Sequence, residues 1–576
     1  MFLVLLETSG NQNFIFSTNK LRENVGASEL TYRVGTQWIL EIISDIKTEG
    51  RIDHDISNEE LRALLTDRQS NPPLEEERTE VELIVATSGK ALLLTRTKET
   101  AQAIVRKATW QTQKRAPGID LCGVFVEFDW NQERSLANAI GSIHKKHEEQ
   151  RNRIPSPQLR FLRLPIVESC SNSGFPASEL ASKNVRTPLS AVSASKQKIT
   201  PKALDRMGQI LQDREDKRLA RTVNELEEQF NAEPLDWLAV IHADGNGLGE
   251  IFLDFQKYLQ DRNSNREYAK KLRQFSIALD TCTENAFLSA LEILPTDSKS
   301  KILPVVPLIL GGDDLTVICD GRRALEFTQR FLQAFERETQ RQDIQEGIVP
   351  EVIGNAFSVA RLSACAGIAI IKPHFPFSAA YELAATAIEK AKRVKTNVKQ
   401  NGRTLPCSAL DFHILRDASG VDLDAIREDL TVDAGKTKLY NRPYIVTPRT
   451  DLQGSDTQAW IDFHHWDGFY QRIQRLKNKR RDLAEGTEEA ESGPELPISQ
   501  INALRVSAYW GHEYAQEHYR QIRQRYDWEL LTALEKGDQS LFAPEPGTEG
   551  TAEETYVAEF LDALEATEFV QADTTE

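Results

Sequence analysis

The sequence lacks the patterns that define disulfide scaffolds, zinc modules and membrane proteins. Its six cysteines are far apart and form no CxxC pair, so neither a disulfide framework nor a zinc ribbon is expected. No uncharged apolar run approaches the roughly 20 residues that a membrane helix needs. The apolar start, Met1 to Leu6, is too short for a signal peptide. We therefore expect reduced thiols, no membrane contact and a cytoplasmic location.

An excess of positive charge is also absent. Lys and Arg number 70 against 87 Asp and Glu, a net charge of −17. This balance excludes a globally basic nucleic-acid coat but permits a local basic groove. Hydrophobic residues make up 40% and charged residues 27%, as in soluble proteins that build sizeable cores. At roughly 150 residues per domain, the chain is long enough for three to four domains.

Two segments, residues 1–150 and 235–448, share one order of predicted elements: strand, helices, hairpin, helix, strand and helix. This order predicts an α+β fold with two ferredoxin-like, palm-type domains, and an internal duplication is the economical explanation. The hairpins pair Val81–Thr87 with Ala91–Thr95 around Ser88-Gly89-Lys90, and Val305–Leu310 with Leu315–Cys319 around Gly311-Gly312-Asp313-Asp314.

The rest of the chain divides by composition. Residues 151–234 are predicted to be a linker rich in Ser, Pro and Asn, followed by a charged helix over Pro201–Phe230. Residues 449–540 show helical patterns and predict a helical C-terminal domain. Residues 541–576 are acidic and predict a tail with one amphipathic helix around Thr555–Leu564 and a frayed end.

The strongest chemical signal is a set of three aspartates. Asp244 ends an apolar strand, and Asp313 and Asp314 lie at a hairpin tip. Neighbouring strand ends in one sheet would bring these carboxylates together, and a divalent cation would relieve their repulsion. Carboxylates and substrate phosphates are the ligands that Mg²⁺ prefers. The pattern predicts an Mg²⁺ or Mn²⁺ site on Asp244, Asp313 and Asp314, suited to in-line phosphoryl transfer.

Glycines surround these aspartates and favour nucleotide binding. The turn after Asp244 leads into a predicted helix, whose free N–H groups could bind a triphosphate. Lys392, or alternatively Lys395, could reach a phosphate from a helix end. The alternative is that the turn after Asp244 and the hairpin tip with Asp313 and Asp314 are only tight turns, and that the lysines belong to a solvated helix end. The candidate nucleotide-binding residues are Gly245, Asn246, Gly247, Gly249, Gly311, Gly312 and Lys392.

From Leu238 to about Tyr444 the sequence resembles the catalytic palm of the large subunit of type III CRISPR effector complexes. Those subunits are relatives of the GGDEF cyclases and make cyclic oligoadenylates from ATP in antiviral defence. The matching pieces are Ala243-Asp244-Gly245-Asn246-Gly247-Leu248-Gly249, the GGDD hairpin Gly311–Asp314, Ser363-Ala364-Cys365-Ala366-Gly367-Ile368-Ala369, Ala391-Lys392, Ser408-Ala409-Leu410-Asp411-Phe412-His413 and Asn441-Arg442-Pro443-Tyr444. Residues 1–150 are similar to the family's first palm.

The resemblance implies a nucleotidyltransferase that releases pyrophosphate. Two ATP molecules would lie between palms paired within one chain, with metals on Asp244 and Asp313 and with Asp314 assisting. Lys392 would neutralise the triphosphate. The first palm has Ser88-Gly89-Lys90 in place of GGDD, so it would bind nucleotide without catalysing.

Some features of the family are missing. His54-Asp55 is the only His-Asp pair, so we expect no HD nuclease domain or activity. The four-cysteine zinc site is absent as well, and His144 and His147 are interpreted as an exposed helix face. The chain is shorter than typical members, which is consistent with a stand-alone or accessory polymerase.

Two other functions remain open at this stage. One is a non-catalytic scaffold that binds nucleotide, RNA and other CRISPR effector subunits; cations between Arg472 and Arg481 could contact RNA or form a solvated face. The other is a GGDEF-like cyclic dinucleotide cyclase. Base preference, ring size and the activating trigger are not determined by the sequence.

Overall fold

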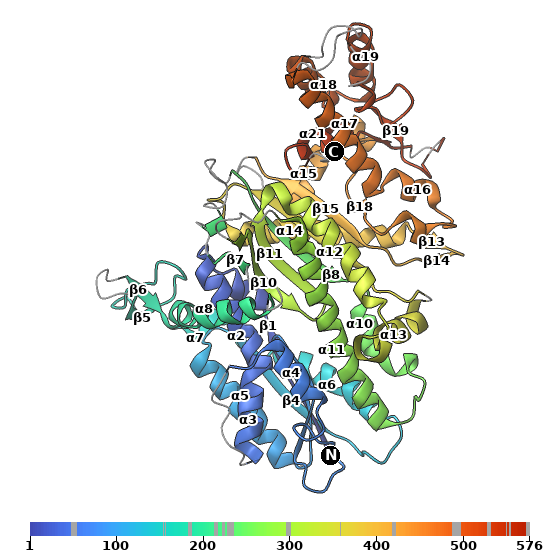
Figure 1. Ribbon diagram of the computed structural model, residues 1–576. Coiled ribbons are helices and arrows are strands. Elements are labelled where there is room, and N and C mark those ends of the chain that lie inside the picture. Colours follow the sequence, from blue (N-terminus) through green and yellow to red (C-terminus); the bar gives the residue numbers. More distant parts are fainter. Residues whose placement is uncertain are drawn as a thin grey trace.

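The computed structural model has three tiers, which Figure 1 shows from blue through green and yellow to red. Residues of the first predicted palm form one end, a six-stranded sheet with its helices lies in the middle, and the C-terminal segment forms the other end. No helix among the described residues is long and apolar enough to cross a membrane. The structure describes residues 1–47, 55–153, 155, 157–181, 187–211, 217–221, 225–226, 236–294, 301–357, 359–416, 422–485, 497–526, 531–548, 550–551 and 554–571.

The first sheet is antiparallel, with strand order β2-β3-β1-β4. Its strands read as near-continuous aliphatic runs because helices cover them; four consecutive residues of β1 are buried. The strands are β1 (Phe2–Ser9), β2 (Val81–Thr87), β3 (Lys90–Thr95) and β4 (Asp120–Glu127), and the helices include α2 (Leu21–Gly35), α3 (Gln37–Lys47), α4 (Asn58–Thr66), α5 (Lys98–Arg115) and α6 (Ser135–Arg151).

The second sheet has the order β10-β11-β8-β12-β15-β18. Its first four strands follow the same order as those of the first sheet, and only β12 and β15 pair in parallel. The strands are β8 (Leu238–Gly245), β10 (Val305–Gly311), β11 (Asp314–Asp320), β12 (Ala364–Ile371), β15 (Ala409–Ile414) and β18 (Tyr444–Ile445). The structure thus has the predicted α+β character and the predicted hairpin.

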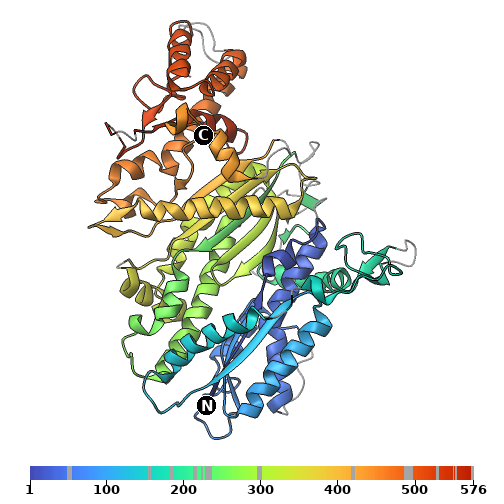
Figure 2. The same cartoon turned by 180° about the vertical axis from the view of Figure 1, so that it is seen from behind.

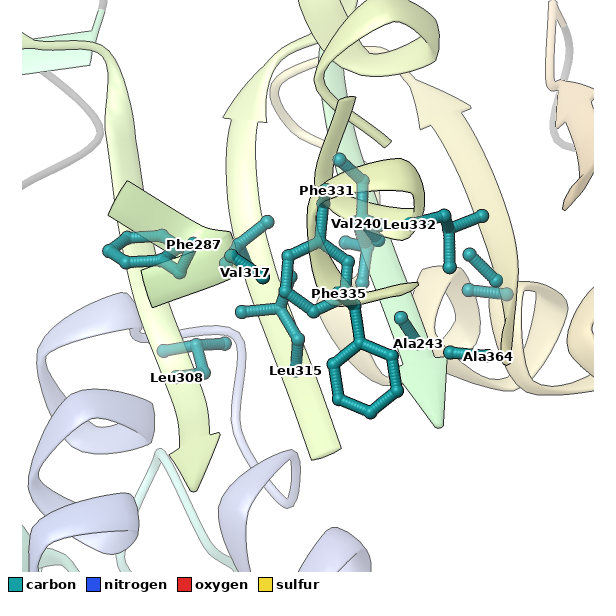
Figure 3. Packing of buried hydrophobic residues seen from close by; sticks show 14 of the residues in the cluster. Val240, Ala243, Phe287, Leu308, Leu315, Val317, Phe331, Leu332, Phe335 and Ala364 are labelled. Carbon is teal, nitrogen blue, oxygen red and sulfur yellow. The ribbon is translucent and has the colours of Figure 1, made fainter. Parts of the chain in front are cut away.

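Helices cover both faces of this sheet. On one face, Phe287 of α11 and Phe331 and Phe335 of α12 pack over the aliphatic side chains of β8 and β11, and all three rings are buried (Figure 3). On the other face α14 approaches β12 so closely that a Cβ at Gly367 would collide with the Ala384 carbonyl. The helices are α10 (Leu248–Asp254), α11 (Asn265–Ala290), α12 (Ala324–Thr339), α13 (Ile348–Phe357) and α14 (Phe377–Lys392).

Residues 1–151 pack directly against the second sheet and its helices. Glu82 of β2 is fully buried and pairs with both Arg266 and Arg273 of α11, each at 2.6 Å. On the other side of this contact, the Phe16 ring stacks on Tyr381 of α14 with centroids 4.3 Å apart. A buried carboxylate between two guanidinium groups is costly to separate, so the two parts hold one relative position.

The predicted charged helix is placed differently from the prediction. Helix α8 spans Ala191–Gln209, because Ser190 accepts a hydrogen bond from the Ser193 N–H and so caps a start inside the predicted linker. Pro201 lies within this helix. Residues 212–216, 222–224 and 227–230 of the predicted helix lie outside the described residues. Before α8, β5 (Ala177–Leu180) and β6 (Pro188–Ser190) form an arm that projects from the body in both views (Figures 1 and 2).

The acidic segment 541–576 packs into the fold where it is described and does not form a separate tail there, and its one predicted helix, around Thr555–Leu564, overlaps an observed helix. Strands β19 (Ala543–Pro544) and β20 (Tyr556–Val557) join β16 (Thr431–Val432) and β17 (Thr437–Lys438) in one small sheet. Helix α21 (Phe560–Ala566) then packs beside α17 (Trp466–Glu485). The acidic composition conceals an apolar set that is almost completely buried. Its members include Leu541, Phe542, Phe560, Leu561, Phe569 and Val570.

Where the structure describes it, the predicted helical region is divided into several separate helices. Helix α16 (Gln458–Phe463) precedes α17, and α18 (Ile498–Ala508) and α19 (His512–Arg523) follow it. The acidic stretch 486–496 between α17 and α18 lies outside the described residues.

Candidate functional site

The sheet register brings the three predicted aspartates together. Ala243 of β8 pairs with Leu315 of β11, so the end of one strand lies beside the start of the other. One carboxylate oxygen each of Asp244, Asp313 and Asp314 lies within 4.8 Å of the others. The predicted convergence of these side chains is therefore confirmed, and the group is partly accessible to solvent.

The electrostatics of this group favour a bound cation. Burial raises the pKa of Asp313, and burial together with the neighbouring Asp313 charge raises the pKa of Asp314. Lys392 forms an ion pair with Asp244. Raised carboxyl pKa values show that negative charge here is poorly compensated by the protein. Three hard oxygen donors with unbalanced charge fit a divalent ion such as Mg²⁺.

The glycine turn after Asp244 is shaped by close packing. A Cβ on Gly245 would lie 2.9 Å from Asp313 Oδ2 and 2.6 Å from Leu248 Cδ1. Gly247 has φ of 77°, which favours glycine. Gly249 differs, because a Cβ there would enter open space. Helix α10 that follows is only seven residues long.

Asn246 has a different setting from the one predicted. Its side-chain amide donates to Ser363 Oγ at 3.0 Å and to the Cys407 carbonyl at 3.2 Å. The amide therefore ties the turn to the neighbouring part of the sheet, and its N–H groups are not directed to a ligand.

The tip of the aspartate hairpin is held by α11. The Gly312 N–H donates to Asp280 Oδ1 at 3.1 Å, and Thr283 Oγ1 donates to the Gly312 carbonyl at 2.5 Å. Gly311 and Gly312 both have positive φ, 154° and 62°. Sequence reasoning missed Asp280 and Thr283. They lie three residues apart on a long helix, a spacing that puts them on one face, but no local signal connects that face with a hairpin 30 residues away.

Comparison with protein families identifies this part of the chain. The model of the Cas10/Cmr2 second palm domain matches residues 237–401, a range that includes the three aspartates and Lys392. This part of the chain resembles a Cas10/Cmr2 second palm domain. No curated protein matches the chain.

Solved structures to which the chain is similar include Csm1–Csm4 cassettes. The complex with AMPPNP and the complex with pppApA are each 15% identical and have a TM-score of 0.39. The complex with cA4 is 14% identical, with a TM-score of 0.36. In each case the match covers 69% of this chain and 53% of the other. The chain thus spans about half the length of these relatives.

Helix α14 of the palm domain carries two residues of the site. Its last residue, Lys392, pairs with Asp244. Three turns earlier, on the same face of α14, Tyr381 lies between Phe16 and His242, and the His242 ring centroid is 5.2 Å from that of Tyr381. The Tyr381 hydroxyl is buried and has no hydrogen-bond partner among the described residues, and burial together with the charge of Asp314 raises its pKa. No sequence signal singled out Tyr381.

The other sequence candidates lie outside the palm site. His54 is outside the described residues, and Asp55 pairs with Arg33 at 2.7 Å and with Lys202 at 3.0 Å. The prediction of an exposed helix face is wrong for His147. This residue of α6 is buried, because the side of the helix that carries it packs against β4. Burial lowers the pKa of this imidazole.

Arg472 is not free to contact RNA as the scaffold interpretation required. Its guanidinium pairs with Glu559 at 3.1 Å and donates to the Ala533 carbonyl at 2.8 Å. In the described part of the predicted basic stretch, Arg475 is exposed. The side chains of residues 478–485 lie outside the described part of the chain.

Proposed function

We propose that the chain is a metal-dependent nucleotidyltransferase that converts ATP to a cyclic oligoadenylate-like second messenger in antiviral defence. The observation that carries the proposal is the convergence of Asp244, Asp313 and Asp314 beside Lys392. The match to the Cas10/Cmr2 palm domain over residues 237–401 supports it. The proposed partners are ATP, RNA and other CRISPR effector subunits.

The chemistry is an in-line displacement at phosphorus. The 3′-hydroxyl oxygen of one ATP attacks the α-phosphorus of a second, a new phosphodiester bond forms, and the bond to pyrophosphate breaks. Mg²⁺ or Mn²⁺ held by the three aspartates would neutralise charge on the phosphate oxygens. Lys392 supplies a further positive charge at the same place, and Gly245 keeps the space beside Asp313 free of side-chain atoms.

In this proposal the first palm, residues 1–150, is a duplicated but non-catalytic partner. Its hairpin tip has no aspartate, and Gly89 is enclosed there: its carbonyl accepts from the Thr8 N–H at 2.8 Å, and its own N–H donates to the Thr31 carbonyl at 2.9 Å. The catalytic palm would be residues 235–448. The first palm would complete the ATP-binding space, and its own hairpin tip at Gly89 would only pack against the rest of that domain.

The test is incubation of the full chain with ATP and Mg²⁺ or Mn²⁺, with measurement of pyrophosphate and of product masses. We expect cyclic oligoadenylate masses from the wild type and none from the double variant Asp313→Ala/Asp314→Ala. Asp254→Asn is the matched control, because Asp254 is an exposed carboxylate paired with Lys257. The proposal is contradicted if the wild type releases no pyrophosphate or if the double variant releases it equally well.

A further inference from the structure

A cavity separate from the aspartate site lies between the palm domain and the C-terminal tier. Its volume is about 250 Å³, and none of the three aspartates or the glycines of the turn lines it. Lys390 and Arg393 at the end of α14 form one wall, and Trp460 and His464 of the C-terminal tier form another. Residues of a helix are spaced about 100° apart, so Lys390 points away from the face on which Lys392 meets Asp244.

Cations dominate the polar lining of this cavity. Five Lys or Arg side chains face two carboxylates there. Four of the five are paired: Arg427 with Asp411 at 2.7 Å, Lys438 with Glu545 at 2.7 Å, Arg442 with Asp562 at 2.9 Å, and Lys390 with Asp424. The pairing is incomplete, because Arg427 Nη1 is buried without a hydrogen-bond partner among the described residues.

Arg393 adds an accessible charge at the rim. Its side chain is exposed, and within the described part of the chain no carboxylate forms an ion pair with it at 4.0 Å or less. The carboxylate of Asp424 lies near Arg393 but forms its ion pair with Lys390. A phosphate entering between Arg393 and Arg427 would satisfy both guanidinium groups.

Aromatic rings provide the other part of the lining. The Trp460 ring stacks on His464 at 4.2 Å, and the Tyr440 ring lies 4.3 Å from the Arg427 guanidinium. Burial lowers the pKa of His464, and the nearby Glu545 acts against this shift. Asn441 Oδ1, also in this lining, is buried without a donor among the described residues. Aromatic faces beside cations are the combination that binds a base and its phosphate.

We propose that this cavity binds a single nucleoside 5′-monophosphate, either free or as the end of an oligonucleotide. The phosphate contacts Arg393 and Arg427, the base lies against Trp460, and Asn441 Oδ1 accepts from an amino group of the base. The volume lies just below the ~300 Å³ at which pockets for drug-sized molecules begin, which suits one nucleotide. The proposal does not depend on catalysis at the aspartates.

The experiment measures binding of AMP to the full chain by calorimetry in EDTA. EDTA and the Asp313→Ala/Asp314→Ala background separate this cavity from the metal site, and AMP should bind equally well in that background. We expect Arg393→Ala and Trp460→Leu each to weaken AMP binding at least about fivefold. Arg403→Ala is the matched control, because Arg403 is an exposed arginine that does not line the cavity.

Adenosine and inorganic phosphate are the two comparison probes. AMP should bind more tightly than either, because only AMP uses both the aromatic and the cationic walls. The proposal is overturned if AMP shows no saturable binding, if phosphate alone binds as tightly, or if Arg393→Ala leaves AMP affinity unchanged. Arg393 is exposed, so this variant decides the question even where Trp460→Leu fails to fold. Competition with a short 5′-phosphorylated oligoadenylate distinguishes a chain end from a free nucleotide.

Discussion

Asp280 of α11 accepts a hydrogen bond from the backbone N–H of Gly312, and its other oxygen accepts from Arg62 at 2.6 Å. Arg62 belongs to α4, which packs with the N-terminal four-stranded sheet, and also pairs with Glu284. The Asp280 carboxylate therefore connects the tip that carries Asp313 to the N-terminal part of the chain. All three side chains are largely shielded from solvent, which strengthens the interaction.

Removal of this link should affect the metal site. We expect Arg62→Ala to lower stability by about 1–3 kcal/mol, because two partly buried carboxylates lose their partner. It should also weaken Mn²⁺ binding several-fold, since the hairpin tip loses its fixed position. Titration of Mn²⁺ by electron paramagnetic resonance measures this. Arg68→Ala is the control, because Arg68 pairs with Glu76 at the surface with 78% of its side chain exposed; equal Mn²⁺ affinity in both variants would refute the link.

Two glycines of the same turn should differ in their tolerance of a methyl group. Gly245→Ala places Cβ 2.9 Å from Asp313 Oδ2, so we expect at least about a tenfold loss of pyrophosphate release, given how sharply rate depends on placement. Gly249→Ala meets open space and should retain activity, with equal or slightly higher stability because alanine favours the helix. Steady-state rates for the two variants provide the comparison. Equal rates would show that the turn has more room than the packing indicates.

The pH dependence of the metal-free protein follows from the two raised carboxyl groups. Burial, with the Asp313 charge, raises the pKa of Asp314 to about 8, and burial raises the pKa of Asp313 to about 6. The folded state thus holds protons that the unfolded chain releases near pH 4. Linkage then requires that this contribution to stability is present at low pH and is lost as the pH rises towards 8.

At pH 8 in EDTA, the double variant Asp313→Asn/Asp314→Asn should therefore melt higher than the wild type, by about 2–4 °C. Mg²⁺ should raise the melting temperature of the wild type and not that of the variant. Thermal unfolding at pH 5 and pH 8, with and without Mg²⁺, tests both statements. A variant that melts lower at pH 8 would contradict the conclusion that burial of these two charged carboxylates destabilises the metal-free protein.

The C-terminal segment should be required for the fold. Asp562 is fully buried, pairs with Arg442 at 2.9 Å and accepts from the Tyr444 hydroxyl at 2.9 Å. Asp562→Ala leaves the Arg442 guanidinium buried without this partner, so we expect a loss of about 3–5 kcal/mol in urea unfolding. Asp538→Ala removes an exposed carboxylate and should change stability by less than about 0.5 kcal/mol. If Asp562→Ala changes stability as little as Asp538→Ala does, the requirement for this segment is contradicted.

Some parts of the candidate site could be predicted from the sequence, and others could not. Asp244 and the Asp313-Asp314 pair could be recognised because each lies where an apolar strand meets a turn. Side chains alternate between the two faces of a strand, so the register of paired strands determines which strand ends meet. Asn246 was predicted from its place in the turn, yet its amide is used within the protein. A turn pattern shows which groups are present but not which neighbour will use them.

The sequence by itself determined the α+β class, the aspartate hairpin and the carboxylates that converge, because these follow from local periodicity and strand order. Only the tertiary structure decided that Arg62 and Asp280 hold the hairpin, that Tyr381 lies against Phe16, and that an acidic C-terminal segment forms a buried core. These contacts join residues separated by more than 200 positions or depend on a few apolar side chains among many charges. Neither local propensity nor composition contains that information, because burial is fixed by which distant surfaces pack together.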